Sequence, residues 1–230
     1  MKLLFPSLYL LLLLTAMACN NNGKTSSVVT EERSDEHQWS QEIDFEDKVS
    51  AFEDENRDIW QKPDRVIDIL GPLNDKIVVD LGAGTGYFAF RLVPKAKKVI
   101  AVDIDEDFVN FMEKKRKLLP ADLQEKFEAR LAKPDDPRLA KNEADALLIV
   151  NTYAYLQNRI EYFTNLQKVL KPNSKIVVIE FKMKNIPNGP PDEEKVGIST
   201  VEEELSAAGF RDIDVDDQTL DYQYIVTARS

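Results

Sequence analysis

The sequence has almost none of the side chains on which thiol and imidazole chemistry depends. Its 230 residues include one cysteine, Cys19, and one histidine, His37. Both lie near the amino terminus, so the rest of the chain excludes cysteine nucleophiles, Cys/His zinc sites and Ser-His triads. We therefore expect no metal site, and any chemistry must rely on carboxylates, hydroxyls, amides, Lys, Arg and the backbone.

Positive charge is also scarce relative to negative charge. The chain has 30 Lys and Arg residues against 41 Asp and Glu residues, which gives a net charge of -11. A protein this acidic lacks the basic surface that holds a phosphate backbone, so we expect no nucleic-acid partner. A hydrophobic fraction of 43% is enough to build a full core. The length predicts one domain with additional segments.

The first residues, MKLLFPSLYLLLLLTAMACN, are typical of a bacterial secretory signal. The apolar run from Leu8 to Leu14 is too short to span a bilayer. Two cleavage patterns compete, because residues 16–18 suit ordinary signal removal, whereas Cys19 behind a small residue resembles the lipobox of lipoproteins. Ala16 stands where a lipobox usually has Leu. An uncleaved anchor with an incidental thiol is the other alternative.

The expected organisation is a signal peptide over residues 1–18, a flexible polar tether over 19–50 and a folded domain over 51–230. We expect lipidation of Cys19 and attachment of the domain to a membrane of the cell envelope, on its periplasmic or outer face. The sequence does not predict an oligomeric state.

Strands and helices alternate through the folded region. A helix is expected from Pro63, with a stop at Gly71. Apolar, Val- and Ile-rich runs predict five strands, at 76–81, 98–104, 127–132, 144–151 and 174–181. The segments between them have helical patterns at 86–93, 106–119 and 160–169. This alternation predicts an α/β fold with a doubly wound parallel sheet covered on both faces.

The pattern changes after the fifth strand. Residues 199–210 predict a short helix, with a capping box from Ser199 to Glu202 and a stop at Gly209. Residues 211–220 and 221–230 then predict two strands joined by a turn. Because a parallel pair needs a long crossover, this pair should be antiparallel. The expected fold is thus a mostly parallel seven-stranded sheet with an antiparallel last strand.

The loop in KIVVDLGAGTGYF carries the main functional signal. Its glycines are spaced Gly82-x-Gly84-x-Gly86, and Tyr87 occupies the position of the last glycine in the dinucleotide fingerprint. NAD and FAD therefore fit poorly, and the phosphate-loop Gly-Lys-Ser/Thr does not follow. A nucleoside ligand without phosphates remains.

Two acids are candidates for contacts with this ligand. Asp80, just before it, is placed to meet a positively charged part of the ligand directly or through water. Asp103 ends the second strand and is placed to accept hydrogen bonds from ribose hydroxyls. The alternative for both acids is a solvated strand end.

Four segments resemble the motifs of class I S-adenosylmethionine-dependent methyltransferases: VVDLGAGTGYF, AVDID, ADALLIVNTYAYL and LKPNSKIVVIEF. The resemblance runs from about Trp60 to the end of the chain and implies S-adenosylmethionine as cofactor. The expected cofactor-binding residues are Asp80, Gly82, Ala83, Gly84, Gly86, Asp103, Ile104, Asp135 and Asn151.

The resemblance also implies a role for each part of this set. The loop 82–86 lies under the methionine portion, Asp103 binds the ribose and Ile104 flanks the adenine. An acid after the third strand, Asp135 or Asp136, lies near the adenine amine.

On the acceptor side the candidates are Asn151, Tyr153 and Tyr155, and for the tyrosines edge packing is an equal alternative. RDIWQKP, NTYAYL and NGPPDEEKVG resemble a bacterial subgroup of the family. Many of its members have two histidines after NTY, where this chain has Ala154 and Tyr155. The turn-rich segment 185–197 is expected to be a lid or a loose surface loop.

Two functions are consistent with these features. The first is methyl transfer from S-adenosylmethionine to a small-molecule or lipid-like acceptor by a membrane-anchored enzyme. The alternative is a non-catalytic or degenerate module that binds an adenosyl ligand at the cell envelope.

Overall fold

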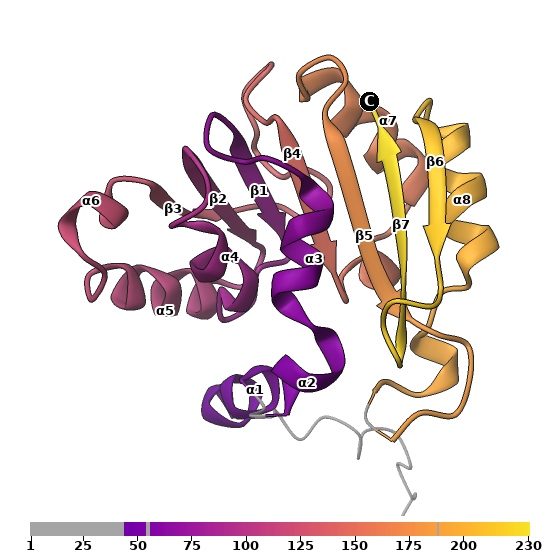
Figure 1. The fold of residues 1–230 in the computed structure, drawn as a ribbon, viewed down its shortest axis with the longest axis horizontal. Helices are drawn as coiled ribbons and strands as arrows, with labels where there is room; N and C mark the ends of the chain where they lie inside the picture. Colours follow the sequence, from indigo (N-terminus) through magenta and orange to yellow (C-terminus); the bar gives the residue numbers. More distant parts are fainter. Residues whose placement is uncertain (1–43, 54–55, 188) are drawn as a thin grey trace, which may run out of the picture. The chain divides into compact units, whose positions relative to one another are not determined.

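The computed structural model describes residues 44–53, 56–187 and 189–230 (Figure 1). The predicted signal peptide, Cys19 and most of the predicted tether lie outside the described residues. Within these three ranges, no helix combines the length and the apolar character that crossing a bilayer requires.

A single seven-stranded sheet forms the centre of the domain, in the order β3-β2-β1-β4-β5-β7-β6. Five strands are parallel, and β7 runs antiparallel to both of its neighbours, β5 and β6. The strands are β1 Ile77–Leu81, β2 Lys98–Asp103, β3 Phe127–Leu131, β4 Ala146–Val150, β5 Lys175–Phe181, β6 Arg211–Asp216 and β7 Gln223–Arg229. The predicted fold class is confirmed.

Helices cover both faces of this sheet (Figure 1). Residues of α3, α4 and α5 pack in one apolar cluster, and residues of α7 and α8 pack in the other. The helices are α1 Phe45–Phe52, α2 Arg57–Gln61, α3 Pro63–Leu70, α4 Tyr87–Leu92, α5 Glu106–Arg116, α6 Ala121–Gln124, α7 Arg159–Val169 and α8 Ile198–Ala207. Two 3-10 turns, η1 Tyr153–Tyr155 and η2 Asp192–Glu194, lie in the loops after β4 and β5.

Strand β1 illustrates why the central strands are apolar throughout. Val78 belongs to the α3–α5 cluster and Val79 to the α7–α8 cluster, and neither side chain is exposed. Successive side chains of a strand point to opposite faces, so a strand covered on both sides needs apolar residues at consecutive positions. The glycine loop therefore follows a strand that is packed on both faces.

The sequence signals for helix ends predict α3 correctly and the start of α8 incorrectly. Pro63 begins α3 and Gly71, with φ of 87°, ends it, as predicted. The capping box at Ser199 and Glu202 is wrong, because α8 begins at Ile198. Its N-cap is Gly197, which has no side chain to bond the first turn.

The amino-terminal boundary of the domain also differs from the prediction. Residues 45–50, predicted as tether, belong to α1. The ring of Phe45 lies 5.2 Å from that of Phe108 and 5.9 Å from that of Phe111. These contacts with α5 give α1 an apolar surface on which to fold.

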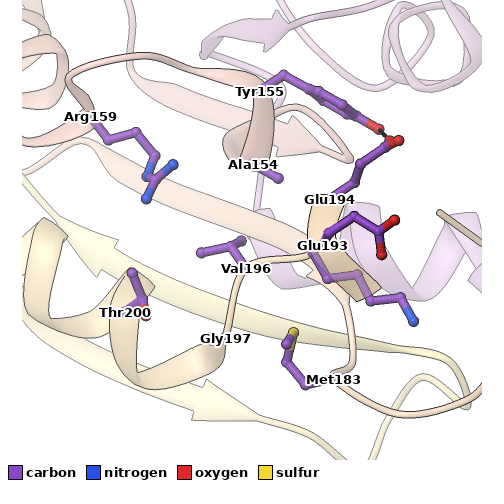
Figure 2. Close-up of a pocket in the computed structure, with 10 residues that line it drawn as sticks. Ala154, Tyr155, Arg159, Met183, Glu193, Glu194, Val196, Gly197 and Thr200 are labelled. Atoms are coloured by element: carbon purple, nitrogen blue, oxygen red, sulfur yellow. Dashed lines mark hydrogen bonds between the residues drawn. The ribbon is translucent and has the colours of Figure 1, made fainter. Parts of the chain in front are cut away.

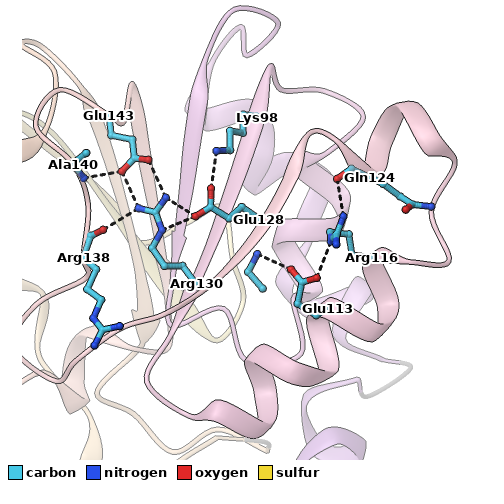
Figure 3. Close-up of polar contacts among 10 residues, drawn as sticks. Lys98, Glu113, Arg116, Gln124, Glu128, Arg130, Arg138, Ala140 and Glu143 are labelled. Carbon is cyan, nitrogen blue, oxygen red and sulfur yellow. Dashed lines mark hydrogen bonds and ion pairs between the residues drawn. The ribbon is translucent and has the colours of Figure 1, made fainter.

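A polar network closes the free edge of the sheet at β3 (Figure 3). Arg130 donates to both carboxylate oxygens of Glu143, at 2.8 and 2.9 Å, and to Glu128 at 2.7 Å. Lys98 of β2 donates to the second oxygen of Glu128 at 2.6 Å. These contacts join β2 and β3 to the loop that leads into β4.

Candidate cofactor and acceptor site

Most of the predicted site residues lie at the carboxyl ends of β1, β2 and β4, close to the loop after β5, whereas Asp135 follows β3. The loops after β1, β2, β4 and β5 are residues 82–86, 104–105, 151–158 and 182–197. Strand β1 lies between β2 and β4, so the chain order reverses there. Open sheets of this kind bind ligands at such a switch point, outside the carboxyl ends of the strands.

The glycine loop is fastened to β2 through its backbone. The amides of Gly82 and Ala83 both donate to the carbonyl of Val102, at 2.8 and 3.0 Å. The φ of Gly84 is 54°, a left-handed conformation that favours glycine. The loop therefore turns sharply above β1, with residues 83–86 buried and Gly82 half-buried.

Asp103 at the end of β2 turns toward this loop. Its Oδ2 accepts from the amide of Gly84 at 2.7 Å, and its Oδ1 accepts from the amide of Asp105 at 3.0 Å. Burial raises the pKa of this carboxyl, although both amides oppose the effect. A carboxylate has further lone pairs for two ribose hydroxyls. Its contact with ribose stays a prediction, and the orientation agrees with it.

The ring of Phe52, at the end of α1, covers the glycine loop. A Cβ placed on Gly84 would lie 3.1 Å from Cδ2 of Phe52. The ring also stacks on Phe108, with centroids 5.4 Å apart, yet it is 42% exposed. Since this ring occupies the space above the loop, it has to move aside when a ligand lies there.

One buried polar atom in the loop is unsatisfied. Oγ1 of Thr85 has no hydrogen-bond partner among the described residues, and the residue is 1% exposed. An unpaired buried hydroxyl in this glycine-rich loop is consistent with a ligand that completes the site. Together with Asp103 and the glycine backbone, it fits an adenosyl cofactor.

Asp80 lies deeper than the sequence indicates. It is 3% exposed, and burial raises the pKa of its carboxyl to about 7. The amide of Ala89 in α4 and the charge of Arg57 favour its ionised form. Asp80 therefore supports the first turn of α4, and its contact with the cofactor stays a prediction.

The two residues assigned to the adenine, Ile104 and Asp135, follow different strands. Ile104, directly after β2, is 61% exposed, which leaves an apolar surface beside Asp103. Asp135 is exposed in the turn after β3, whereas Asp136 accepts from the amide of Arg138 at 2.7 Å. Among the described residues, no hydrogen bond or ion pair joins Asp135 to the glycine loop, so its role also stays a prediction.

Asn151 lies beside the glycine loop with a strained backbone. Its φ is 54°, which is uncommon for a residue other than glycine. Its Oδ1 accepts from Nε2 of Gln223 in β7 at 2.5 Å. The next residue, Thr152, is in direct contact with the loop, because a Cβ on Gly82 would lie 2.2 Å from its Oγ1.

The two predicted tyrosines have opposite environments. Tyr153 is completely buried, stacks on Phe163 at 5.0 Å and donates to Glu204 at 2.9 Å. It is a core residue, so its assignment to the acceptor side is wrong and the packing alternative holds. Tyr155 is 61% exposed and donates to Glu194 at 3.1 Å.

A cavity of about 570 Å³ opens next to Tyr155 (Figure 2). Figure 2 shows the Tyr155 hydroxyl meeting Glu194, while Ala154 and Val196 border the hollow between η1 and the loop after β5. The residues that line the cavity are Ala154, Tyr155, Arg159, Met183, Glu193, Glu194, Lys195, Val196, Gly197 and Thr200. The segment after β5 is therefore one wall of a cavity rather than a loose surface loop.

Several residues at this edge of the sheet carried no signal in the sequence. Glu180, near the end of β5, is 3% exposed and accepts from the amide of Tyr153 at 2.6 Å. Gln61 and Gln223 are fully buried. A glutamine in the sequence is normally expected at the surface. These two are buried because α2, β4 and β7 pack together in the folded domain.

Comparison with known proteins identifies the family. A sequence model described as a methyltransferase domain matches residues 73–225, about two thirds of the chain. Among curated proteins, the tRNA U34 carboxymethyltransferase of Glaesserella parasuis is 44% identical over 62 residues. That match spans 26% of this chain and 19% of the relative, so the chain corresponds to about a fifth of the relative's length.

Solved structures extend the similarity to most of the chain. A SAM-dependent methyltransferase from Aquifex aeolicus is 25% identical, with a TM-score of 0.74 over 81% of this chain and 98% of that one. An S-adenosylmethionine-dependent methyltransferase from Mesorhizobium loti is 17% identical, with a TM-score of 0.60 over 73% and 96%. The chain belongs to the methyltransferase domain family, with the fold and the cofactor loop of its class I S-adenosylmethionine-dependent members.

Proposed function

We propose that this protein transfers the methyl group of S-adenosylmethionine to an acceptor bound at the carboxyl edge of the sheet. The observation that carries the proposal is the contact of Asp103 with the amide of Gly84 at 2.7 Å. It places a carboxylate against the main chain of the glycine loop, where we expect a nucleoside without phosphates to bind. Membership of the methyltransferase domain family supports the same reaction.

In this proposal, different residues bind different parts of the cofactor. Asp103 accepts from the ribose, Ile104 covers the adenine and the loop 82–86 lies under the methionine portion. The bound cofactor supplies a methyl group on a positively charged sulfur, and the bonding electrons return to that sulfur when the methyl leaves. The chain's main task is then to align the acceptor with the methyl, since proximity supplies much of the acceleration.

We propose that the acceptor is a small or lipid-like molecule that enters by the cavity beside Tyr155. A volume of about 570 Å³ lies within the usual range of about 300–1,000 Å³ for ligand pockets. Met183 and the ring of Tyr155 are 57% and 61% exposed there, which suits an acceptor with an apolar part. The lining also contains two acids, Glu193 and Glu194, and two bases, Arg159 and Lys195.

RNA is a weaker candidate for the acceptor. The tRNA-modifying relatives match this chain over 62 residues, about a fifth of their length. Binding to a phosphate backbone is driven by Lys and Arg residues that displace counterions, and a net charge of -11 disfavours it. A stretch this short does not support a common acceptor.

Calorimetric titration of the domain with S-adenosylhomocysteine and with NAD tests the donor. We expect heat with the first ligand and none with the second. Asp103→Asn should weaken binding of S-adenosylhomocysteine by about 1–3 kcal/mol, because it removes a charged hydrogen-bond acceptor. Asp107→Asn, an equal change in the neighbouring α5, is the control. An unchanged affinity in Asp103→Asn would show that the ribose assignment is wrong.

The alternative is an adenosyl-binding module without turnover. Ala154 and Tyr155, which stand where many members of the resembling subgroup have two histidines, favour it. Incubating the protein and cell-envelope extract with methyl-labelled S-adenosylmethionine separates the two functions. Transfer of label to a component of the extract supports the enzyme, and binding without any transfer supports the module.

We further propose that Cys19 carries a lipid and holds the domain at a membrane of the cell envelope. The support is the order of charge, apolar run and small residues before the single cysteine of the chain. Export would separate the domain from cofactor made in the cytoplasm, so the place of turnover is part of the same question.

A further inference from the structure

Three side-chain amides, of Gln61, Gln223 and Asn151, form a hydrogen-bonded row that ends directly after β4. Nε of Arg57 donates to Oε1 of Gln61 at 2.5 Å, and Nε2 of Gln61 donates to Oε1 of Gln223 at 2.9 Å. Nε2 of Gln223 in turn donates to Oδ1 of Asn151 at 2.5 Å. The row crosses from α2 to β7 and from there to the end of β4.

The arginine at one end sets the direction of every bond in the row. A guanidinium has five N–H donors and no acceptor, so Gln61 has to present its oxygen to Arg57. The amide nitrogen of Gln61 then faces Gln223, whose nitrogen in turn faces Asn151. Gln61 and Gln223 are both 0% exposed, so water cannot replace a bond that is made the wrong way round.

The last amide has an unpaired donor group. Its Oδ1 accepts from Gln223, whereas its Nδ2 has no hydrogen-bond partner among the described residues. Asn151 is half-buried and precedes Thr152, which touches Gly82 of the glycine loop. The free donors of Asn151 therefore lie beside the loop.

We propose that Arg57, Gln61 and Gln223 are positioning residues that hold Asn151 as a hydrogen-bond donor to the carboxylate of the cofactor's amino-acid tail. The inference rests on the proposed function, because it assigns one end of the same ligand. Asp103 of β2 marks the ribose end of the mouth, and Asn151 follows β4 on the other side of β1. A tail that leaves the ribose across the loop reaches Asn151.

The orientation of the row predicts the effect of changing its second member. In Gln61→Glu, one carboxylate oxygen pairs with Arg57 and the other faces Gln223, which has to donate to it. Gln223 then offers its oxygen to Asn151, and Asn151 turns its own oxygen toward the ligand. Two oxygens repel, so the carboxylate loses its donor although Asn151 itself is unchanged.

Titration with S-adenosylhomocysteine and with methylthioadenosine tests this directly. The two ligands share the adenosine and the sulfur, and only the first has the amino-acid group. We expect Gln61→Glu to weaken binding of S-adenosylhomocysteine by about 10- to 100-fold and to leave binding of methylthioadenosine unchanged. Gln124→Glu, the same chemical change in the distant helix α6, should alter neither.

A second variant keeps the test decisive if Gln61→Glu does not fold. Asn151→Gly removes the donor without adding charge and suits the φ of 54°. It should show the same selective loss. Equal losses for the two ligands, or none, in a folded variant would overturn the inference. Failure of the wild-type protein to bind either ligand would instead contradict the proposed function.

Discussion

Glu180 is a buried acid whose ionisation works against the folded state. Burial raises the pKa of its carboxyl to about 7 from an ordinary value of 4.5, although the amides of Tyr153 and Ala154 favour the charged form. The folded protein therefore binds this proton more tightly than the unfolded chain does. Its contribution to stability is fully present below pH 4.5 and is lost as the pH rises through 7.

Glu180→Gln should remove this dependence on pH. Between pH 4.5 and 8, the free energy of unfolding of the wild type should fall relative to the variant by on the order of 3 kcal/mol. Urea denaturation of both proteins at several pH values measures the difference. A difference that stays constant across this range would contradict the assignment.

At the residue scale, the sequence predicts positions well and environments poorly. Asp103 was expected at the mouth, and it lies there because the end of a parallel strand has one location. Tyr153 and Tyr155 were equivalent in the sequence, yet the short 3-10 turn η1 sends one ring into the core and the other into solvent. Such a turn has no hydrophobic period from which the two orientations can be read.

Among the elements, α1 brings an aromatic ring to the glycine loop. Its last residue, Phe52, covers Gly84 and stacks on Phe108. The sequence contains a usable signal, since Phe45, Val49 and Phe52 follow helical spacing. The polar residues before and between them conceal it, and the surface of α5 that they meet is formed only in the folded domain.

Phe52→Ala should make the mouth easier to enter. A stacked aromatic pair contributes about 0.5–1.5 kcal/mol, so its loss should raise the uncovered population by about 2- to 12-fold. We expect S-adenosylhomocysteine to associate correspondingly faster, which stopped-flow tryptophan fluorescence can follow through Trp60. Ile59→Ala, on the exposed side of α2, is the control. Equal association rates in Phe52→Ala and the wild type would contradict a covering role for the ring.

The network at the β3 edge should contribute to stability in proportion to its burial. The side chains of Arg130 and Glu143 are 17% and 18% exposed, and their contact lowers the pKa of the Glu143 carboxyl. Arg130→Met should lower the free energy of unfolding by about 1–3 kcal/mol, between the values for surface and buried pairs. Arg65→Met, on the exposed side of α3, should change it little.

Acid should weaken this network, because a lowered pKa stabilises the folded state only while the group is charged. Its contribution is present above the ordinary pKa of Glu143, which is 4.5, and is lost as the pH falls below it. The stability of Arg130→Met and of the wild type should therefore converge in acid. Parallel pH profiles would count against the network.

For the whole molecule, the sequence predicts the class of fold through the order of its elements. Five Val- and Ile-rich runs separated by helices permit few arrangements other than a parallel sheet with helices on both faces. The antiparallel orientation of the last two strands followed from their short connection. The order of elements does not predict that Phe52 covers the glycine loop, nor the cavity beside Tyr155. Both depend on segments that are far apart in the sequence and meet only in the folded domain.

Attachment to a membrane is a property of the whole chain and can be tested in cells. Labelling with a tagged fatty acid should mark the wild-type protein and should not mark Cys19→Ser. The wild type should sediment with membranes, because acyl chains supply about 0.8 kcal/mol for each buried methylene. Equal labelling of the two proteins would rule out the lipid on Cys19.

The contact between Gly82 and Thr152 limits how this sequence can vary. A methyl group on residue 82 would lie 2.2 Å from the Thr152 hydroxyl oxygen, so the loops after β1 and β4 meet with no room for a second side chain. The φ of Gly82 is 73°, which disfavours a side chain even where space is available. Among descendants of this chain, position 82 should therefore stay glycine whatever residue stands at position 152, 70 residues away.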